Sequence, residues 1–185
     1  EIGVFTGCST LAMAIALPSD GRVVAVEASE KWVEVGKEFW TRSGCADRID
    51  LRIGEANDVL DALIAQGLAG TFDLAFIDAN KDGYEGYFER CLVLLRQNGI
   101  MVFDNVLFGG KVQDDTDVRG SQEHQKLPKF LQDLHAKYAE GLHHFNERIA
   151  RDERVDIVVL PMIDGVTLAR KKQTVSSASG AAERD

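Results

Sequence analysis

The sequence predicts an α/β fold with a mainly parallel sheet of seven strands and helices on both faces. Short apolar runs of strand length alternate with longer segments that carry apolar residues at helical spacing. Glycine-containing turns separate these segments. Two of the runs, residues 72–78 and 99–104, each end in an aspartate, as expected where buried strands reach the carboxyl edge of an open sheet.

The first half of the chain supplies three strand–helix units. Gly7 marks the first turn, and Ser9 and Thr10 can cap the helix that follows it. Ser29 can cap the second helix, and Gly44 can end it. We predict the end of a strand at residues 1–4 and strands at 22–27 and 48–53. The predicted helices are residues 11–17, a segment from the Ser29 cap to about 42, and 56–66.

The second half of the chain completes the sheet. Apolar residues recur every three or four positions from Leu127 to Ile149, which predicts one amphipathic helix, or two if Gly141 marks a break. The other predicted elements are a strand at 72–78, a helix at 84–96, a turn at 97–99, a strand at 99–104, a polar loop at 108–123 and an antiparallel hairpin of 155–160 with 165–170. We expect one domain at 1–172 and a disordered tail at 173–185.

Composition excludes several classes of function. The chain has 185 residues, a net charge of −9 and no basic stripe, so nucleic acid is not an expected partner. The apolar runs are too short to cross a bilayer. Cys8, Cys45 and Cys91 form no CxxC pair, which favours reduced thiols in the cytoplasm. Because residues 1–3 resemble the end of a strand, we expect the sequence to be a fragment that lacks an upstream segment.

Polar residues follow the two aspartate-ending strands. Asp78 is followed by Lys81, and Asp104 by Asn105. Carboxylate and amide oxygens from neighbouring strand ends form a hard site that suits Mg²⁺, Mn²⁺ or Ca²⁺. The alternative is that either aspartate only caps the next helix or turn.

A second group of residues is typical of a nucleoside site. Gly3 and Gly7 form a glycine turn between a strand and a helix, although the spacing is not GxGxxG and plain packing explains the turn equally well. Glu27 ends the second strand, where an acidic residue commonly accepts hydrogen bonds from ribose hydroxyls. The alternative for Glu27 is a solvated loop residue. Glu55 and Ala56 follow the third strand, where an adenine can rest.

Four motifs together carry a resemblance to a known family. They are E-I-G-V-F-T-G-C-S-T, D-A-N-K-D-G-Y-E-G-Y, D-N-V-L-F-G-G-K-V and L-P-M-I-D-G-V-T-L-A-R. They resemble the cation-dependent O-methyltransferases, which include caffeoyl-CoA O-methyltransferase and, more distantly, catechol O-methyltransferase. The resemblance runs from about Glu1 to Lys172 and implies a Rossmann-like class I methyltransferase fold with S-adenosylmethionine as methyl donor.

The resemblance also implies site residues. Asp78, Asp104 and Asn105 would hold the divalent cation, and Lys81 would stand near the reacting hydroxyl, with Lys81 and Asp78 as catalytic residues. The cofactor would be lined by Glu1, Gly3, Ser9, Glu27, Ala56, Asn80 and Tyr87.

The implied reaction is methyl transfer to one hydroxyl of a vicinal aromatic diol, of the catechol or caffeoyl type. A divalent cation would lower the pKa of the acceptor hydroxyl, and Lys81 would take its proton or stabilise the anion. A homodimer is expected when the upstream segment is present. The alternatives are a non-catalytic S-adenosylmethionine-binding protein of the same fold and a nicotinamide oxidoreductase, which would lack its usual GxGxxG motif here.

Three departures from the family pattern affect these expectations. Asn80 stands where family members often have Asp, which removes a charge near the sulfonium. Phe108 and Gly109 replace the aromatic–Asn pair of the plant enzymes, so a preference for a CoA thioester does not follow. The segment at 122–140, between the substrate loop and the last helix, is longer than is usual in the family. It either reshapes the acceptor pocket or a subunit contact, or it is an inert helical extension.

Overall fold

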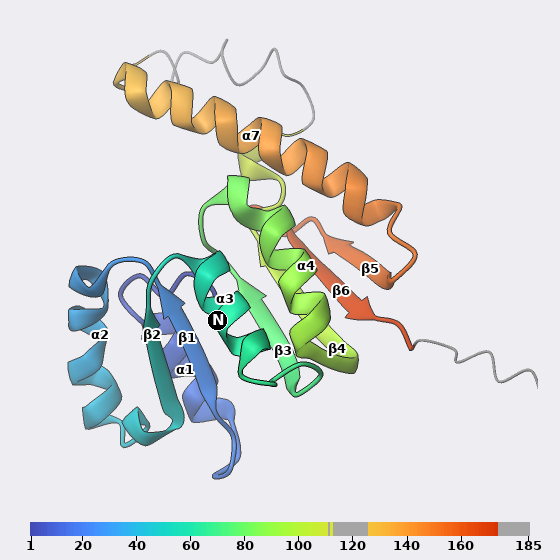
Figure 1. The fold of residues 1–185 in the computed structure, drawn as a ribbon. Coiled ribbons are helices and arrows are strands. Elements are labelled where there is room, and N and C mark those ends of the chain that lie inside the picture. Colours follow the sequence, from blue (N-terminus) through green and yellow to red (C-terminus); the bar gives the residue numbers. More distant parts are fainter. Residues whose placement is uncertain (111, 113–125, 174–185) are drawn as a thin grey trace, which may run out of the picture.

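The computed structural model of the protein describes residues 1–110, 112 and 126–173. Strands and helices alternate up to the fourth strand, and an antiparallel hairpin follows, as predicted (Figure 1). β1 pairs with β2 and β3 pairs with β4 in parallel, whereas β6 lies antiparallel between β4 and β5. The strands are β1 (Val23–Glu27), β2 (Ile49–Ile53), β3 (Phe72–Ile77), β4 (Leu95–Asp104), β5 (Val155–Leu160) and β6 (Val166–Lys171).

A single residue joins the two halves of the sheet. Ile2 forms parallel bridges with Val26 of β1 and Ile77 of β3. Gly3 then turns away with a φ of 92°, so regular pairing does not continue. The described residues therefore form six strands and not the predicted seven, because residues 1–4 supply a bridge in place of a strand. On the amino side of this bridge, a cavity of about 450 Å³ lies between β1 and β3.

The helices cover both faces of the sheet. Figure 1 shows α3 and α4 on one face and α1 on the other. Each face has its own apolar core, one built around Phe88, Phe103 and Phe145 and the other around Val33 and Trp40. The helices are α1 (Cys8–Ala16), α2 (Glu30–Arg42), α3 (Ala56–Ala65), α4 (Tyr84–Leu94) and α7 (Lys129–Ala150), and the short 3₁₀ turns are η1 (Ala46–Arg48), η2 (Lys81–Gly83) and η3 (Phe108–Gly110).

The largest differences from the predicted boundaries are at the start of α1 and at the junction of α4 and β4. α1 begins at Cys8, with Gly7 at the N-cap position, because the Ser9 and Thr10 hydroxyls donate to the carboxylate of Glu1 and do not cap the helix. α4 ends at Leu94, since the next residue is already extended, and the predicted turn at 97–99 lies within an irregular part of β4.

The late amphipathic segment is one helix of 22 residues, α7, and Gly141 does not break it. α7 passes over η2 at Gly141, where a Cβ atom would lie 3.4 Å from the Cα of Asp82. The predicted loop at 108–123 is described only at 108–110 and 112, and residues 122–125 and 174–185 of the predicted insertion and tail lie outside the described residues. No helix in the described part of the chain is both long and apolar enough to cross a membrane.

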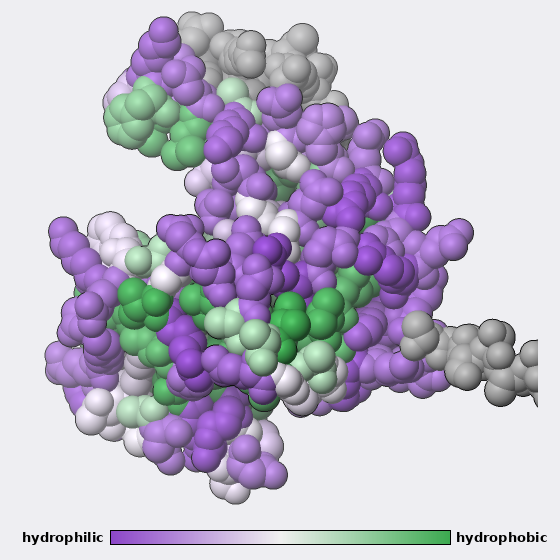
Figure 2. Space-filling model, viewed as in Figure 1, coloured by the Kyte–Doolittle hydropathy of each residue, from purple (hydrophilic) through white to green (hydrophobic). Residues whose placement is uncertain are grey.

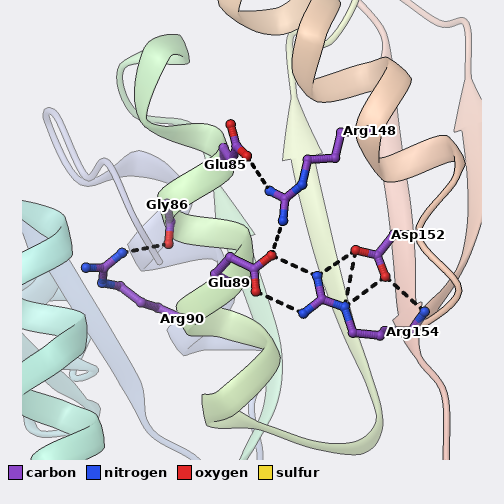
Figure 3. A network of polar contacts seen from close by, with 7 residues as sticks. All are labelled: Glu85, Gly86, Glu89, Arg90, Arg148, Asp152 and Arg154. Carbon is purple, nitrogen blue, oxygen red and sulfur yellow. Dashed lines mark hydrogen bonds and ion pairs between the residues drawn. The ribbon is translucent and has the colours of Figure 1, made fainter.

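An ion-pair network fastens α7 and the hairpin to α4 (Figure 3). Arg148 of α7 contacts Glu85 and Glu89 of α4. Arg154, just before β5, donates to both oxygens of Glu89 at 2.7 and 2.9 Å and to Asp152 at 2.6 Å. These hydrogen bonds from Arg154 hold the pKa values of Glu89 and Asp152 below their usual range. The network keeps α7 at the carboxyl ends of the strands, where the candidate site lies.

Candidate functional site

A cavity of about 270 Å³ opens at the carboxyl ends of β1, β2 and β3. This volume is close to the lower end of the range for small-molecule pockets, which begins at about 300 Å³. Figure 2 shows that the molecular surface is hollowed between the part formed by α7 and the part formed by α2. The cavity is lined by Gly3, Phe5, Val26, Glu27, Ala28, Glu55, Ala56, Asp78, Ala79, Asn80 and Tyr87.

Gly3 allows the first turn to lie directly on the end of β3. A Cβ atom at this position would lie 2.4 Å from the carbonyl oxygen of Asp78, and the φ of 92° is also unfavourable for other residues. The glycine therefore brings the backbone of the turn against the Asp78–Ala79 peptide and leaves space for a ligand beside it.

The carboxylate of Glu27 is fixed by backbone donors. Its Oε2 accepts hydrogen bonds from the amides of Val4 at 3.0 Å and Phe5 at 2.9 Å, and its Oε1 accepts one from Ser29 at 3.0 Å. The carboxylate is thus part of the cavity wall and holds the first turn against β1. A carboxylate oxygen can accept two hydrogen bonds, so Oε1 keeps the capacity to accept one from a ligand.

Asn80 lies at the centre of a polar chain on the opposite wall. Its Oδ1 accepts from the Tyr87 hydroxyl at 2.5 Å, and its Nδ2 donates to Asp82 at 2.7 Å. Asp82 also accepts from Lys137 of α7 at 2.5 Å. Burial would raise the pKa of Asp82, but the hydrogen bonds from Lys137 and Asn80 outweigh it and leave this pKa below its usual range. Burial also raises the pKa of Tyr87.

Lys81 is the buried cation of the site. Its side chain is only 8% exposed. Its Nζ lies 2.7 Å from Asp78 Oδ1, 2.7 Å from the Tyr84 hydroxyl and 3.0 Å from Asn105 Oδ1. The carbonyl oxygen of Asp104 lies farther away, at 3.4 Å. The ammonium therefore draws oxygens from the ends of β3 and β4 to one point.

Asp104 and Asn105 are held in place at the end of β4. Asn105 has a φ of 57°, a left-handed conformation that Asn tolerates better than most residues. Its amide N–H donates to Asp104 Oδ1 at 2.7 Å. The Tyr84 hydroxyl donates to the carbonyl oxygen of Asp104 at 2.7 Å. Burial raises the pKa of Tyr84 well above its usual range, so this hydroxyl stays protonated and serves as a fixed donor.

The donor set fits a hard divalent cation. Asp78 Oδ1 and Asn105 Oδ1 converge on the same ammonium, and Asp104 adds a carboxylate from the same strand end. Two carboxylates and an amide are oxygen ligands of the kind that Mg²⁺, Mn²⁺ and Ca²⁺ bind. No group of three or more His, Cys, Asp or Glu side chains in the described part of the chain is placed to hold a metal ion, so a cation here would need the Asn105 amide as well as the two aspartates.

Two predicted cofactor residues lie outside the cavity lining. Ser9 donates to the carboxylate of Glu1, as does Thr10, and neither Glu1 nor Ser9 is among the lining residues. Burial raises the pKa of Glu1, although the two hydroxyls oppose this shift. These two hydrogen bonds hold α1 against Glu1, which lies beside the cavity.

An aromatic group lies beyond Asn105. Phe108 of η3 meets the rings of His135 and Tyr138 of α7 edge-on, with ring centroids 5.7 and 6.2 Å away. Burial raises the pKa of Tyr138, and the charge of Asp82 adds to this shift. α7 thus adds aromatic surface to the edge of the sheet that carries Lys81.

Sequence reasoning missed several of these residues. Tyr84 follows Lys81 by three positions and so could have been identified as a neighbour on the same helical turn. Phe5 lines the cavity and packs against Trp32 with centroids 5.1 Å apart, a contact that only the fold creates. The pair of Asp82 and Lys137 joins residues 55 positions apart and has no local signal.

Comparison with known proteins gives a consistent set of relatives. A family model described as O-methyltransferase matches residues 1–172. Tricin synthase 2 of Oryza sativa subsp. japonica is 42% identical over 172 residues, which are 92% of this chain and 55% of that protein. Caffeoyl-CoA O-methyltransferase of Eucalyptus gunnii is 39% identical over 173 residues, which are 94% of this chain and 65% of that protein. The chain thus spans between about half and two thirds of the length of these relatives.

The fold has solved counterparts. An O-methyltransferase from Bacillus cereus, determined in complex with SAH, superimposes with a TM-score of 0.76 at 32% identity. The match covers 92% of this chain and 72% of that chain. The described residues therefore share the α/β fold of a protein that binds the demethylated form of S-adenosylmethionine.

Proposed function

The chain belongs to the O-methyltransferase family, and we propose that it transfers the methyl group of S-adenosylmethionine to one hydroxyl of a vicinal aromatic diol with the help of a divalent cation. One observation carries the proposal. Oxygens of Asp78 and Asn105, from the ends of β3 and β4, converge on one point, and Asp78 also lines the cavity that contains Glu27. The methyl-donor site and the cation site thus share Asp78, so a methyl donor and an acceptor bound there would lie next to each other.

Different residues of the cavity would contact different parts of the cofactor. The fixed carboxylate of Glu27 accepts a hydrogen bond from a ribose hydroxyl through Oε1, and Ala56 provides an apolar surface for adenine. Gly3 lets the methionine part of the cofactor approach the backbone, while Asn80 and Tyr87 form the polar wall opposite. These residues would hold the cofactor beside Asp78, which lines the same cavity.

Asp78, Asp104 and Asn105 hold the cation, with Mg²⁺ as the expected ion and Mn²⁺ or Ca²⁺ as substitutes. When bound, the cation lowers the pKa of an acceptor hydroxyl beside it. Lys81, which lies at this point, would stabilise the resulting anion as an ammonium, or would take the hydroxyl proton if it is in its neutral amine form. Orientation of the two ligands supplies much of the remaining acceleration.

The acceptor binds on the side of α7. Phe108 and Tyr138 offer aromatic faces there, which suit a flat ring. Two adjacent ring hydroxyls can approach the cation while the ring packs on these side chains. Catechols and caffeoyl esters are therefore the acceptor class that this edge favours.

The test is methyl transfer to a panel of catechols and caffeoyl esters, followed by mass spectrometry, with Mg²⁺ and with a chelator. We expect a product heavier by one methylene that disappears with the chelator. Asp104→Ala should reduce turnover at least 100-fold while changing S-adenosylmethionine binding less than threefold, since removing one group that stabilises developing charge typically costs about two to three orders of magnitude. Asp50→Ala, on the exposed surface of β2, serves as the control and should keep full activity.

Two results would contradict the proposal. Full activity of Asp104→Ala would contradict the assignment of Asp104 as a ligand of the divalent cation. Cofactor binding without any product, across the whole panel, would favour a non-catalytic S-adenosylmethionine-binding protein of the same fold.

A further inference from the structure

Lys81 forms a complete set of contacts for a cation inside the candidate site. A lysine ammonium has three protons to donate. Here three oxygens lie within 3.0 Å of Nζ, from Asp78, Tyr84 and Asn105, and the side chain is almost fully buried. The arrangement neutralises the Asp78 carboxylate and satisfies the Asn105 amide oxygen without any external ion.

Two of these three oxygens are the ones that the proposed function assigns to the divalent cation. Mg²⁺ binds oxygens at about 2.0–2.1 Å and Ca²⁺ at about 2.3–2.6 Å. A divalent cation that bound Asp78 Oδ1 and Asn105 Oδ1 would therefore lie in the space around Lys81 Nζ. Two positive charges at such short range repel strongly in a buried site. The ammonium and a divalent cation therefore cannot hold both oxygens at once.

We infer that Lys81 is a built-in counter-ion that occupies the cation site through Asp78 and Asn105 and leaves these two oxygens when a divalent cation binds. The inference rests on the proposed function, because it takes the same oxygens as cation ligands. Tyr84 and the Asp104 carbonyl do not belong to that ligand set, so the displaced ammonium keeps partners while it moves. Cation binding would thus release Lys81 from Asp78 and present it to the acceptor.

The inference has two measurable consequences. Removing the ammonium should expose Asp78 and Asn105 to an external cation without competition, so divalent cations should bind more tightly. Without an external cation, the same change leaves a carboxylate and an amide without their partner, so the protein should be less stable until a cation is added.

The experiment measures Mn²⁺ binding by titration calorimetry and thermal unfolding with and without Mn²⁺, on the full chain. Lys81→Met removes the charge, and Lys81→Gln is a second variant that keeps a polar group in case the methionine variant does not fold. Lys137→Met is the control, because it removes a lysine that pairs with Asp82 on the same edge but contacts neither Asp78 nor Asn105. We expect the Lys81 variants to bind Mn²⁺ at least tenfold more tightly than the wild type and the control to change less than threefold.

Thermal unfolding gives the second readout. The Lys81 variants should melt several degrees below the wild type in chelator and recover most of that loss with saturating Mn²⁺. Equal or weaker Mn²⁺ binding by both Lys81 variants would overturn the inference and leave the cation site in place, and so would an equal gain in the Lys137 control. Absence of Mn²⁺ binding in every protein would instead refute the proposed cation site, and the inference with it.

Discussion

Replacing Glu27 with glutamine tests the structure of the cofactor cavity most directly. The glutamate uses both oxygens, since Oε2 accepts from Val4 and Phe5 and Oε1 accepts from Ser29. A glutamine has one oxygen and one NH₂ group, so in either orientation the NH₂ group faces a backbone N–H at about 3 Å. At least one of these backbone donors then loses its acceptor, and a ribose hydroxyl bound here loses a charged acceptor.

The expected magnitudes follow from these contacts. A lost acceptor for one partly buried donor costs about 1 kcal/mol, which lowers the melting temperature of a chain of this size by roughly 2–4 °C. A lost hydrogen bond to a charged group costs about 1.5–3 kcal/mol, so the dissociation constant of S-adenosylmethionine should rise about 10- to 150-fold. The effect on binding should therefore exceed the effect on stability.

Titration calorimetry and thermal unfolding on the same samples measure the two effects. Glu34→Gln is the matched control, because Glu34 is an exposed residue of α2 whose partner is Lys37. The control should bind the cofactor within twofold of the wild type. A change of less than threefold in the dissociation constant for Glu27→Gln, together with an unchanged melting temperature, would refute both the fixed geometry of the carboxylate and its role in ribose binding.

Three further substitutions probe the surrounding structure. Gly3→Ala should lower stability by more than about 3 kcal/mol, because the new Cβ would meet the Asp78 carbonyl. Gly44→Ala is the control and should cost only about 1 kcal/mol of backbone strain, because no atom lies near its Cβ. Equal melting temperatures of the two variants would contradict the close approach at Gly3. Tyr84→Phe should cost about 1–3 kcal/mol in chemical denaturation, since the Asp104 carbonyl loses its shorter hydrogen bond and Lys81 loses one acceptor. A loss below about 0.5 kcal/mol would contradict this role. Glu89→Gln should cost about 0.5–1 kcal/mol at pH 7, after allowance for solvent screening. Because the pKa of Glu89 is lowered in the folded protein, its stabilisation is fully present above the unfolded pKa of about 4.3 and is lost as pH falls through the lower folded pKa. The difference between variant and wild type should therefore shrink as pH falls below about 4 in urea unfolding. A difference independent of pH would contradict the ion pair.

Local sequence patterns predicted most of the fold. Apolar residues at helical spacing located α3 and α7, and apolar runs that end in Asp78 and Asp104 located β3 and β4 near their carboxyl ends. The start of β4 at Leu95 was not predicted, because the letters Arg-Gln-Asn-Gly that follow are typical of a turn. Of the strand end predicted at residues 1–4, only Ile2 pairs, with parallel bridges to both neighbouring strands.

The site was predicted as a set of strand ends, but its contacts were not. The rule that ligands bind at the carboxyl edge of a parallel sheet brings Asp78, Asp104 and Glu27 together whatever the side chains do. It does not say that Lys81 turns inward to meet Asn105, which lies 24 positions away. That orientation depends on Tyr84, whose buried hydroxyl contacts both Lys81 and the Asp104 carbonyl. The burial of a lysine among acceptors from two strands is a tertiary property, and no local pattern encodes it.

Asn80 shows how one residue links the cofactor cavity to α7. Its amide accepts from Tyr87 and donates to Asp82, two roles that an aspartate could not fill together, since an ionised carboxylate only accepts. An aspartate at this position would also place a second carboxylate within hydrogen-bond distance of Asp82. With asparagine, Asp82 keeps its charge for Lys137 of α7. The chain therefore lacks a negative charge at this point of the cavity, and the amide joins the cavity wall to the helix that carries Tyr138.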